Sequence, residues 1–194
     1  MLEKIPFNRP AFIKKAEAYL SQALQSGHLS GDGDFTKQST ALLEELIGVR
    51  KALLTTSCTH ALEMAAILMD LKTGDEVILP SFTFVSTVNA VVLRGAKPVF
   101  IDIRPDTLNL DENQLERLIT PRTKAIFVVH YAGVACEMDT ISQISANTTS
   151  LWWKITRMGS LEVTKGRILV PLGFWQLKAF TRQRISALVK AARF

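Results

Sequence analysis

The sequence predicts an α/β fold with a mainly parallel sheet. Between residues 51 and 130, short apolar runs typical of strands alternate with segments of helical periodicity. The connections between these segments are short, as they are when helices join parallel strands. With 194 residues, the chain is also long enough to bury a sizeable core.

The part of the chain before this alternation predicts two helices. The apolar residues of the first helix recur at helical spacing: Phe12, Ala16, Tyr19, Ala23 and Leu24. Gly27 ends this helix, and residues 31–34 form a loop. Thr36 is the expected cap of the second helix, which ends at Gly48. This helix carries four apolar residues: Leu42, Leu43, Leu46 and Ile47.

The alternating region predicts four strands, three helices and one shared edge. Strands are expected at residues 51–55, 76–79, 98–101 and 125–129, and helices at residues 59–70, 84–93 and 111–119. Ligands of parallel sheets bind beyond the carboxyl ends of the strands. The segment 55–60, Phe84 and His130 each follow a predicted strand, so we expect them to converge at that edge.

Small hydroxyl residues cluster where the helix at residues 59–70 is expected to begin. They are Thr55, Thr56, Ser57 and Thr59. A helix N-terminus presents N–H groups without helical partners and a partial positive charge, so it binds anions well. One interpretation of the cluster is therefore a phosphate site. The alternative is an ordinary helix cap made by Ser57 or Thr59.

Three motifs in this order resemble the DegT/StrS-type sugar-nucleotide aminotransferases. The motifs are Thr-Ser-Cys-Thr-x-Ala-Leu-Glu at 56–63, Pro-Ser-Phe-Thr-Phe-Val-Ser-Thr-Val-Asn at 80–89, and Val-His-Tyr-Ala-Gly at 129–133. The resemblance covers residues 5–146, and within the family it is strongest to the transaminases that make dTDP-4-amino-4,6-dideoxygalactose. It implies that residues 1–146 are the N-terminal part of the large domain of the aspartate-aminotransferase fold, with pyridoxal 5'-phosphate as cofactor.

The resemblance also implies which residues bind the cofactor. Cys58, Thr59 and the amide of His60 match the phosphate anchor, although the family has a small residue where this chain has His60. Phe84 matches the aromatic residue that stacks on the cofactor ring, and a core position is its alternative. His130 and Tyr131 match a pair near the substrate pocket, and a structural role is the alternative for His130. No metal site is expected.

Two catalytic groups of the family are missing from the sequence. The acid beside the pyridine nitrogen belongs to a Glu-Asp-x-Ala motif, and the Schiff-base lysine belongs to Ser-Phe-His-x-x-Lys-Asn. Residues 151–157 and 179–185 stand in their places, and Lys178 and Lys190 lie in no matching context. We therefore expect no catalytic residue in this chain, and an inactive, truncated copy of the enzyme.

The composition changes after residue 146. Residues 1–146 hold 14 basic and 17 acidic side chains, whereas residues 147–194 hold nine basic and one acidic, together with Trp152, Trp153 and Trp175. We expect residues 147–194 to be a basic, poorly structured tail translated out of frame. One alternative is a non-catalytic fragment whose tail, with a basic amphipathic helix near residues 182–193, contacts nucleic acid or anionic lipid.

The family implies particular partners and a location. Its members transfer the amino group of glutamate to a dTDP-4-keto-6-deoxyhexose and form homodimers, and another nucleotide keto-sugar is an alternative substrate. Cys58 and Cys136 fit neither a disulfide framework nor a metal motif, and free thiols suit the cytoplasm. With no signal-peptide pattern and no long apolar run, we expect no membrane partner, and on the enzyme interpretation no nucleic-acid partner.

Overall fold

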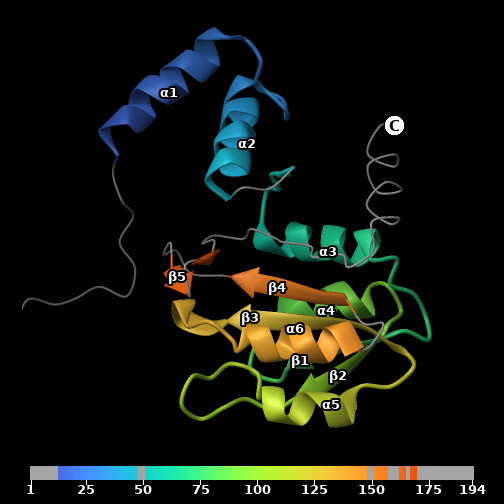
Figure 1. Ribbon diagram of the computed structural model, residues 1–194. Helices are drawn as coiled ribbons and strands as arrows, with labels where there is room; N and C mark the ends of the chain where they lie inside the picture. Colours follow the sequence, from blue (N-terminus) through green and yellow to red (C-terminus); the bar gives the residue numbers. More distant parts are fainter. Residues whose placement is uncertain (1–12, 48–50, 148–150, 157–161, 165–166, 170–194) are drawn as a thin grey trace, which may run out of the picture. The chain divides into compact units, whose positions relative to one another are not determined.

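The computed structural model in Figure 1 describes residues 13–47, 51–147, 151–156, 162–164 and 167–169. The chain divides into two compact units, residues 1–54 and residues 55–194. The predicted basic helix near the end of the chain lies outside the described residues.

The first unit contains the two predicted helices, α1 (Lys14–Gln25) and α2 (Asp34–Ile47). Gly27 follows α1 with a φ of 69°, a left-handed conformation that favours glycine, so the predicted helix end is confirmed. The predicted cap Thr36 is wrong, because α2 already begins at Asp34, whose carboxylate lies in the positive first turn. Across the two helices the rings of Tyr19 and Phe35 meet edge to face, with centroids 5.5 Å apart.

The strand predicted at residues 51–55 is absent, and this segment forms a loop. The N–H group of Ala52 donates to the carboxylate of Glu44 at 3.0 Å, which gives this backbone group a side-chain partner in place of a strand. Lys51 forms an ion pair with the same carboxylate at 3.0 Å. Ala52 is buried, but Leu53 and Leu54 are 53% and 42% exposed, so most of the apolar run that predicted a strand does not enter a core.

The second unit contains a four-stranded parallel sheet with the strand order β2-β1-β3-β4. Its strands are β1 (Glu76–Pro80), β2 (Lys97–Ile101), β3 (Thr123–His130) and β4 (Leu151–Thr156). Helices connect consecutive strands, because parallel neighbours cannot be joined by a tight turn. The predicted α/β fold with a mainly parallel sheet is confirmed, as are the strands expected near residues 76, 98 and 125.

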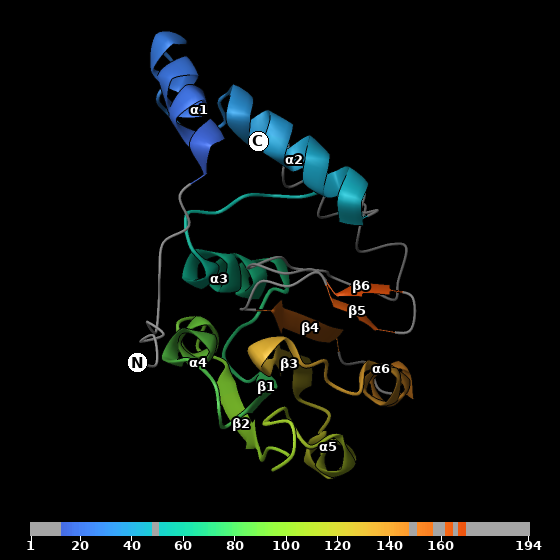
Figure 2. The ribbon, with the colours of Figure 1, turned by 90° about the vertical axis from the view of Figure 1, so that its left-hand side faces the viewer.

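Helices cover both faces of this sheet (Figure 2). On one face lie α3 (Cys58–Leu68) and α4 (Val85–Val92), and on the other lie α5 (Leu115–Leu118), preceded by the 3₁₀ turn η1 (Glu112–Gln114), and α6 (Met138–Asn147). Alternate residues of a strand point to opposite faces. Accordingly, Val77 and Phe127 belong to the core beneath α3 and α4, whereas Ile78 and Ile126 belong to the core beneath α5.

A buried carboxylate ties the beginning of the central strands together. Glu76, which is 4% exposed, accepts hydrogen bonds from the Thr120 hydroxyl at 2.6 Å and from the Arg122 guanidinium at 2.9 and 3.2 Å. Lys97 of β2 lies 3.8 Å from the same carboxylate. The Thr120 hydrogen bond, with Arg122 and Lys97, lowers the pKa of Glu76 below its ordinary value.

Part of the segment expected to be a tail belongs to the sheet. Residues 151–156 form β4 and pair with β3 in parallel from Leu151 to Thr156, so β3 has a strand on both sides. Further on, β5 (Glu162–Thr164) and β6 (Arg167–Leu169) form an antiparallel pair. The domain boundary at residue 146 stays a prediction. Among the described residues, no helix has both the length and the apolar character that crossing a membrane requires.

Candidate functional site

The hydroxyl cluster forms a structured N-terminus for α3. Ser57 is extended, with φ −157° and ψ 161°, and its Oγ accepts the N–H of His60 at 3.1 Å. The Thr55 hydroxyl donates to the carbonyl of Ser57 at 2.9 Å, and the Thr56 hydroxyl is hydrogen-bonded to Nδ1 of His60. Of the two residues considered as a cap, Ser57 and Thr59, it is Ser57 that caps α3, and the segment before α3 is held by its own hydrogen bonds.

The same geometry suits an anion. Cys58 and Thr59 are the first two residues of α3, at the end of the helix that carries a partial positive charge. Ser57 accepts one hydrogen bond and keeps its own O–H proton for donation to a ligand. By contrast, the N–H of His60, expected in the phosphate anchor, already donates to Ser57. Hydroxyl and N–H donors at a positive helix end match the chemistry of a phosphate group.

Phe84 lies on the surface at the beginning of α4. It occupies the N-cap position with φ −74° and ψ 145°, and it is 53% exposed. The alternative interpretation of Phe84 as a core residue is therefore wrong. Phe84 follows β1, so it lies beyond the carboxyl end of a strand, where ligands of parallel sheets bind.

The predicted pair His130 and Tyr131 divides into a buried and an exposed member. His130 ends β3 and is 1% exposed, and its Nδ1 accepts the N–H of Cys136 at 3.0 Å. This burial favours the structural role for His130. Tyr131 is 38% exposed, and its ring packs against Phe82 at a centroid distance of 4.9 Å.

These segments lie on the same edge of the sheet. The contact between Phe82 and Tyr131 joins the loop after β1 to the turn after β3. Figure 1 shows the first turn of α3 on the side toward which β3 and β4 point. This arrangement agrees with the expectation that three segments converge at the carboxyl edge of the sheet. They are residues 55–60, the loop that carries Phe84, and the end of β3.

One buried residue at this edge was not predicted from the sequence. Asn109 is 2% exposed; its Nδ2 donates to the carbonyl of Val134 at 3.0 Å, and its Oδ1 accepts the N–H of Tyr131 at 2.9 Å. Its only sequence signal is an amide residue between two apolar ones, Leu108 and Leu110. Such a pattern does not reveal a partner more than 20 residues away.

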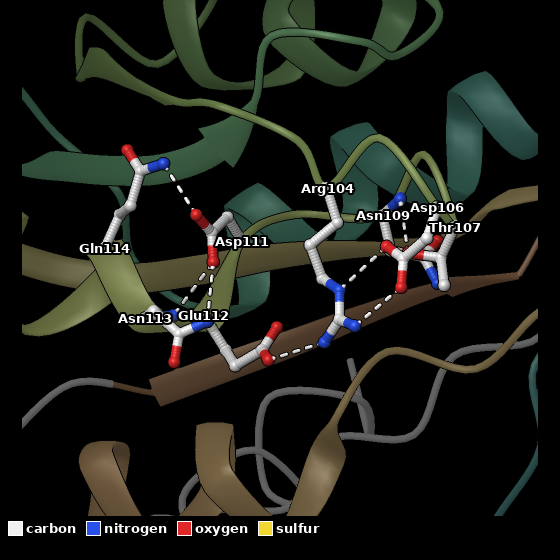
Figure 3. A network of polar contacts seen from close by, with 8 residues as sticks. All are labelled: Arg104, Asp106, Thr107, Asn109, Asp111, Glu112, Asn113 and Gln114. Atoms are coloured by element: carbon white, nitrogen blue, oxygen red, sulfur yellow. Dashed lines mark hydrogen bonds and ion pairs between the residues drawn. The ribbon is translucent and has the colours of Figure 1, made fainter.

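An arginine holds the loop that carries Asn109 (Figure 3). Arg104 donates to both carboxylate oxygens of Asp106 at 3.0 and 2.7 Å, and to Glu112 at 2.8 Å. These hydrogen bonds lower the pKa of Asp106. The N–H of Arg104 also donates to the carbonyl of Asn109 at 2.8 Å. In the part of the chain that the structure describes, no group of three His, Cys, Asp or Glu side chains is placed to hold a metal ion.

Known structures that resemble this chain include aminotransferases. The aminotransferase from Psychrobacter cryohalolentis superposes with a TM-score of 0.72 and 30% sequence identity, covering 78% of this chain and 38% of that one. The putative sugar aminotransferase Spr1654 from Streptococcus pneumoniae, in its PMP form, gives a TM-score of 0.70 with 32% identity, covering 73% and 36%. The same Streptococcus protein is also known in a PLP form.

The family assignment comes from the sequence comparison. Residues 10–153 match the model of the DegT/DnrJ/EryC1/StrS aminotransferase family. The spore coat polysaccharide biosynthesis protein SpsC of Bacillus subtilis (strain 168) is 38% identical over 143 residues, which are 74% of this chain and 36% of SpsC. The chain belongs to the DegT/DnrJ/EryC1/StrS aminotransferase family, whose cofactor is pyridoxal phosphate. It spans little more than a third of the length of these relatives.

Proposed function

We propose that this chain is the cofactor-binding, N-terminal part of an aminotransferase that transfers the amino group of glutamate to a dTDP-4-keto-6-deoxyhexose. The observation that carries the proposal is the capped N-terminus of α3 on the same sheet edge as the exposed ring of Phe84, in a chain of this family. The proposed product is dTDP-4-amino-4,6-dideoxygalactose. The proposed location is the cytoplasm, and the proposed assembly is a homodimer.

Each residue of the proposed site has a defined task. The Ser57 hydroxyl and the positively charged N-terminus of α3, which begins with Cys58 and Thr59, would hold the phosphate. Phe84 covers one face of the pyridine ring, which keeps water from that face. Tyr131 lies at the substrate side. When bound, pyridoxal phosphate supplies an electron sink that stabilises negative charge on the substrate carbon.

Turnover requires groups that this chain does not contain. The family's lysine, which moves protons, and its acid, which keeps the pyridine nitrogen protonated, have no counterpart in the sequence. We therefore expect cofactor binding without transamination. Incubating the chain with pyridoxal phosphate, glutamate and dTDP-4-keto-6-deoxyglucose should yield no amino sugar above a protein-free control, and amino-sugar formation would disprove this part of the proposal.

We further infer that residues after about 147 are the family's next segment read in a shifted frame. With permitted codons, a one-base shift across residues 180–185 spells His-Glu-Thr-Lys-Asn, and the same shift across residues 151–158 spells Val-Val-Glu-Asp-Asn-Ala-His. These are the lysine and acid motifs in the family order. The nucleotide sequence tests the inference: a one-base repair near codons 140–150 should restore both motifs, and codons unable to spell them would refute it.

Cofactor binding is tested with a substitution that separates capping from anion binding. Ser57→Asp keeps a carboxylate oxygen to cap α3 but places a negative charge where the phosphate would lie. Pyridoxamine phosphate is the probe, because it lacks the aldehyde that reacts with surface lysines. In equilibrium dialysis we expect saturable binding by the wild type and by Ser57→Thr, and a loss of more than about tenfold in Ser57→Asp at unchanged thermal stability. Equal binding by all three would exclude this phosphate site.

A further inference from the structure

The turn after β3 has a conformation that needs support. It is the 3₁₀ turn η2 (Tyr131–Gly133), in which Ala132 adopts φ 50° and ψ 24°. A residue other than glycine in this left-handed region is strained and persists where its surroundings hold it in place. The strain lies directly beside Tyr131, so whatever holds the turn also fixes the position of that side chain.

Asn109 bonds to both ends of this turn. Its Oδ1 accepts the N–H of Tyr131 at 2.9 Å, and its Nδ2 donates to the carbonyl of Val134 at 3.0 Å. A single amide side chain therefore fixes the distance between the first residue of the turn and the residue that follows it. Because Asn109 is 2% exposed, water is a poor substitute for either bond.

The loop that carries Asn109 is itself held by several contacts. Ile103 and Leu110 pair in an isolated β-bridge, and the N–H of Arg104 donates to the carbonyl of Asn109. The Arg104 guanidinium then joins Asp106 to Glu112 across the loop (Figure 3). The amide of Asn109 is thus presented to the turn from an anchored backbone.

The position of Tyr131 matters because its ring touches the loop after β1. Phe82 and Tyr131 pack with centroids 4.9 Å apart and with their ring planes inclined by 49°. Phe82 is two residues before Phe84, the exposed aromatic residue at the beginning of α4. A chain of contacts therefore leads from Asn109, through the backbone and ring of Tyr131, to the segment that carries Phe84.

We propose that Asn109 is a positioning residue, which holds the turn at residues 131–134 so that Tyr131 supports the loop after β1. This loop carries Phe82 and Phe84 and is called the aromatic loop below. The assignment of a cofactor to that loop rests on the proposed function. The clamp, by which we mean the two hydrogen bonds between Asn109 and the turn, does not depend on the proposed function. The two can fail independently, so the test measures them separately.

The test uses amide hydrogen exchange in the full chain. Asn109→Leu has a similar shape but removes both hydrogen bonds, whereas Asn109→Asp keeps an acceptor for the Tyr131 N–H. Asn113→Leu is the matched control, because Asn113 lies in η1 and its N–H and side-chain amide donate to Asp111. Asn109→Leu should raise the exchange rate of the Tyr131 amide by a factor at least ten times larger than the factor for the amides of β1. Asn109→Asp and Asn113→Leu should leave the Tyr131 amide protected.

Ligand binding gives the second readout. Asn109→Leu should weaken pyridoxamine phosphate binding several-fold and leave the binding of inorganic phosphate unchanged, because the aromatic loop is disturbed and the N-terminus of α3 is not. If the wild type binds no pyridoxamine phosphate, the proposed function fails while amide exchange still decides on the clamp. Unaltered exchange at Tyr131 would overturn the positioning role. The positioning role would also be overturned if the Asn109→Leu variant did not fold, or if all of its amides exchanged faster by the same factor.

Discussion

The imidazole of His130 and the backbone of Cys136 are joined by a buried hydrogen bond. The Cys136 N–H donates to Nδ1 of His130 at 3.0 Å, and the Cys136 thiol donates to the carbonyl of Val129 at 3.2 Å. The chain thus folds back on the last residues of β3. His130, predicted near the substrate pocket, acts here as an acceptor that fixes the course of the following segment.

His130→Leu should lower the free energy of unfolding by about 1–3 kcal/mol, because it leaves the buried N–H of Cys136 without this acceptor. His130→Asn should cost less, since the amide oxygen can take the place of Nδ1. Urea unfolding of the three proteins measures the differences. Equal losses in the two variants would mean that ring volume, and not the hydrogen bond, is what matters at this position.

Glu76 should make the stability depend on pH in the acid range. Its folded pKa is lowered, chiefly by the Thr120 hydroxyl and then by Arg122, so the folded state favours the carboxylate. The contribution is fully present above the ordinary glutamate pKa of about 4.3 and is lost as the pH falls from there through the lowered folded pKa. Glu76→Gln should cost about 1–3 kcal/mol at pH 7.

The Glu76→Gln variant should also show a flatter loss of stability below about pH 4.3 than the wild type. Denaturant midpoints measured from pH 7 down to pH 3 test this. Some acid sensitivity will remain, because the pKa values of Asp106 and Asp111 are also lowered in the folded state. Parallel pH profiles for wild type and variant would contradict the role given to the Glu76 carboxylate.

Arg104→Met should destabilise the loop at residues 102–112 more than Asp106→Asn does. Glu112 is 7% exposed and would lose its cation, whereas the Asp106 side chain is 57% exposed and returns to water. Thermal unfolding ranks the two variants. A smaller effect of Arg104→Met than of Asp106→Asn would show that the ion pair with Glu112 adds nothing.

Phe84→Ala should weaken pyridoxamine phosphate binding several-fold with little change in stability. Phe84 is 53% exposed, so its removal costs the core little, whereas the bound ligand would lose the ring on which it stacks. Phe84→Tyr should bind like the wild type. Dialysis and thermal unfolding give the two readouts. A large loss of stability in Phe84→Ala without a change in affinity would show that Phe84 serves in packing and not in cofactor binding.

The sequence was a good guide to the fold where local patterns follow burial. The buried runs around Val77 and Phe127 predict two strands of the sheet, because such strands are apolar along their whole length. The same criterion fails for Leu53 and Leu54, which form an apolar run but are exposed in a loop. An apolar run alone does not tell which residues reach a core.

The site was predictable only in its local parts. Ser57 could be named as one of two possible caps, with Thr59, because capping acts within three residues of sequence. Asn109 was missed because its partners, Tyr131 and Val134, are 22 and 25 residues away. No pattern within the loop records a hydrogen bond to another segment.

The strand order β2-β1-β3-β4 has a consequence for how the chain acquires its structure during synthesis. β1 and β2 can pair first, but the third strand joins on the opposite side of β1, and β4 must then add beside β3. Each pairing waits for a helix-containing connection to be made, and such non-local contacts form slowly. Until residue 156 has left the ribosome, the apolar β3 has an open edge. A chaperone that shields unpaired strands would act on the nascent chain during this interval.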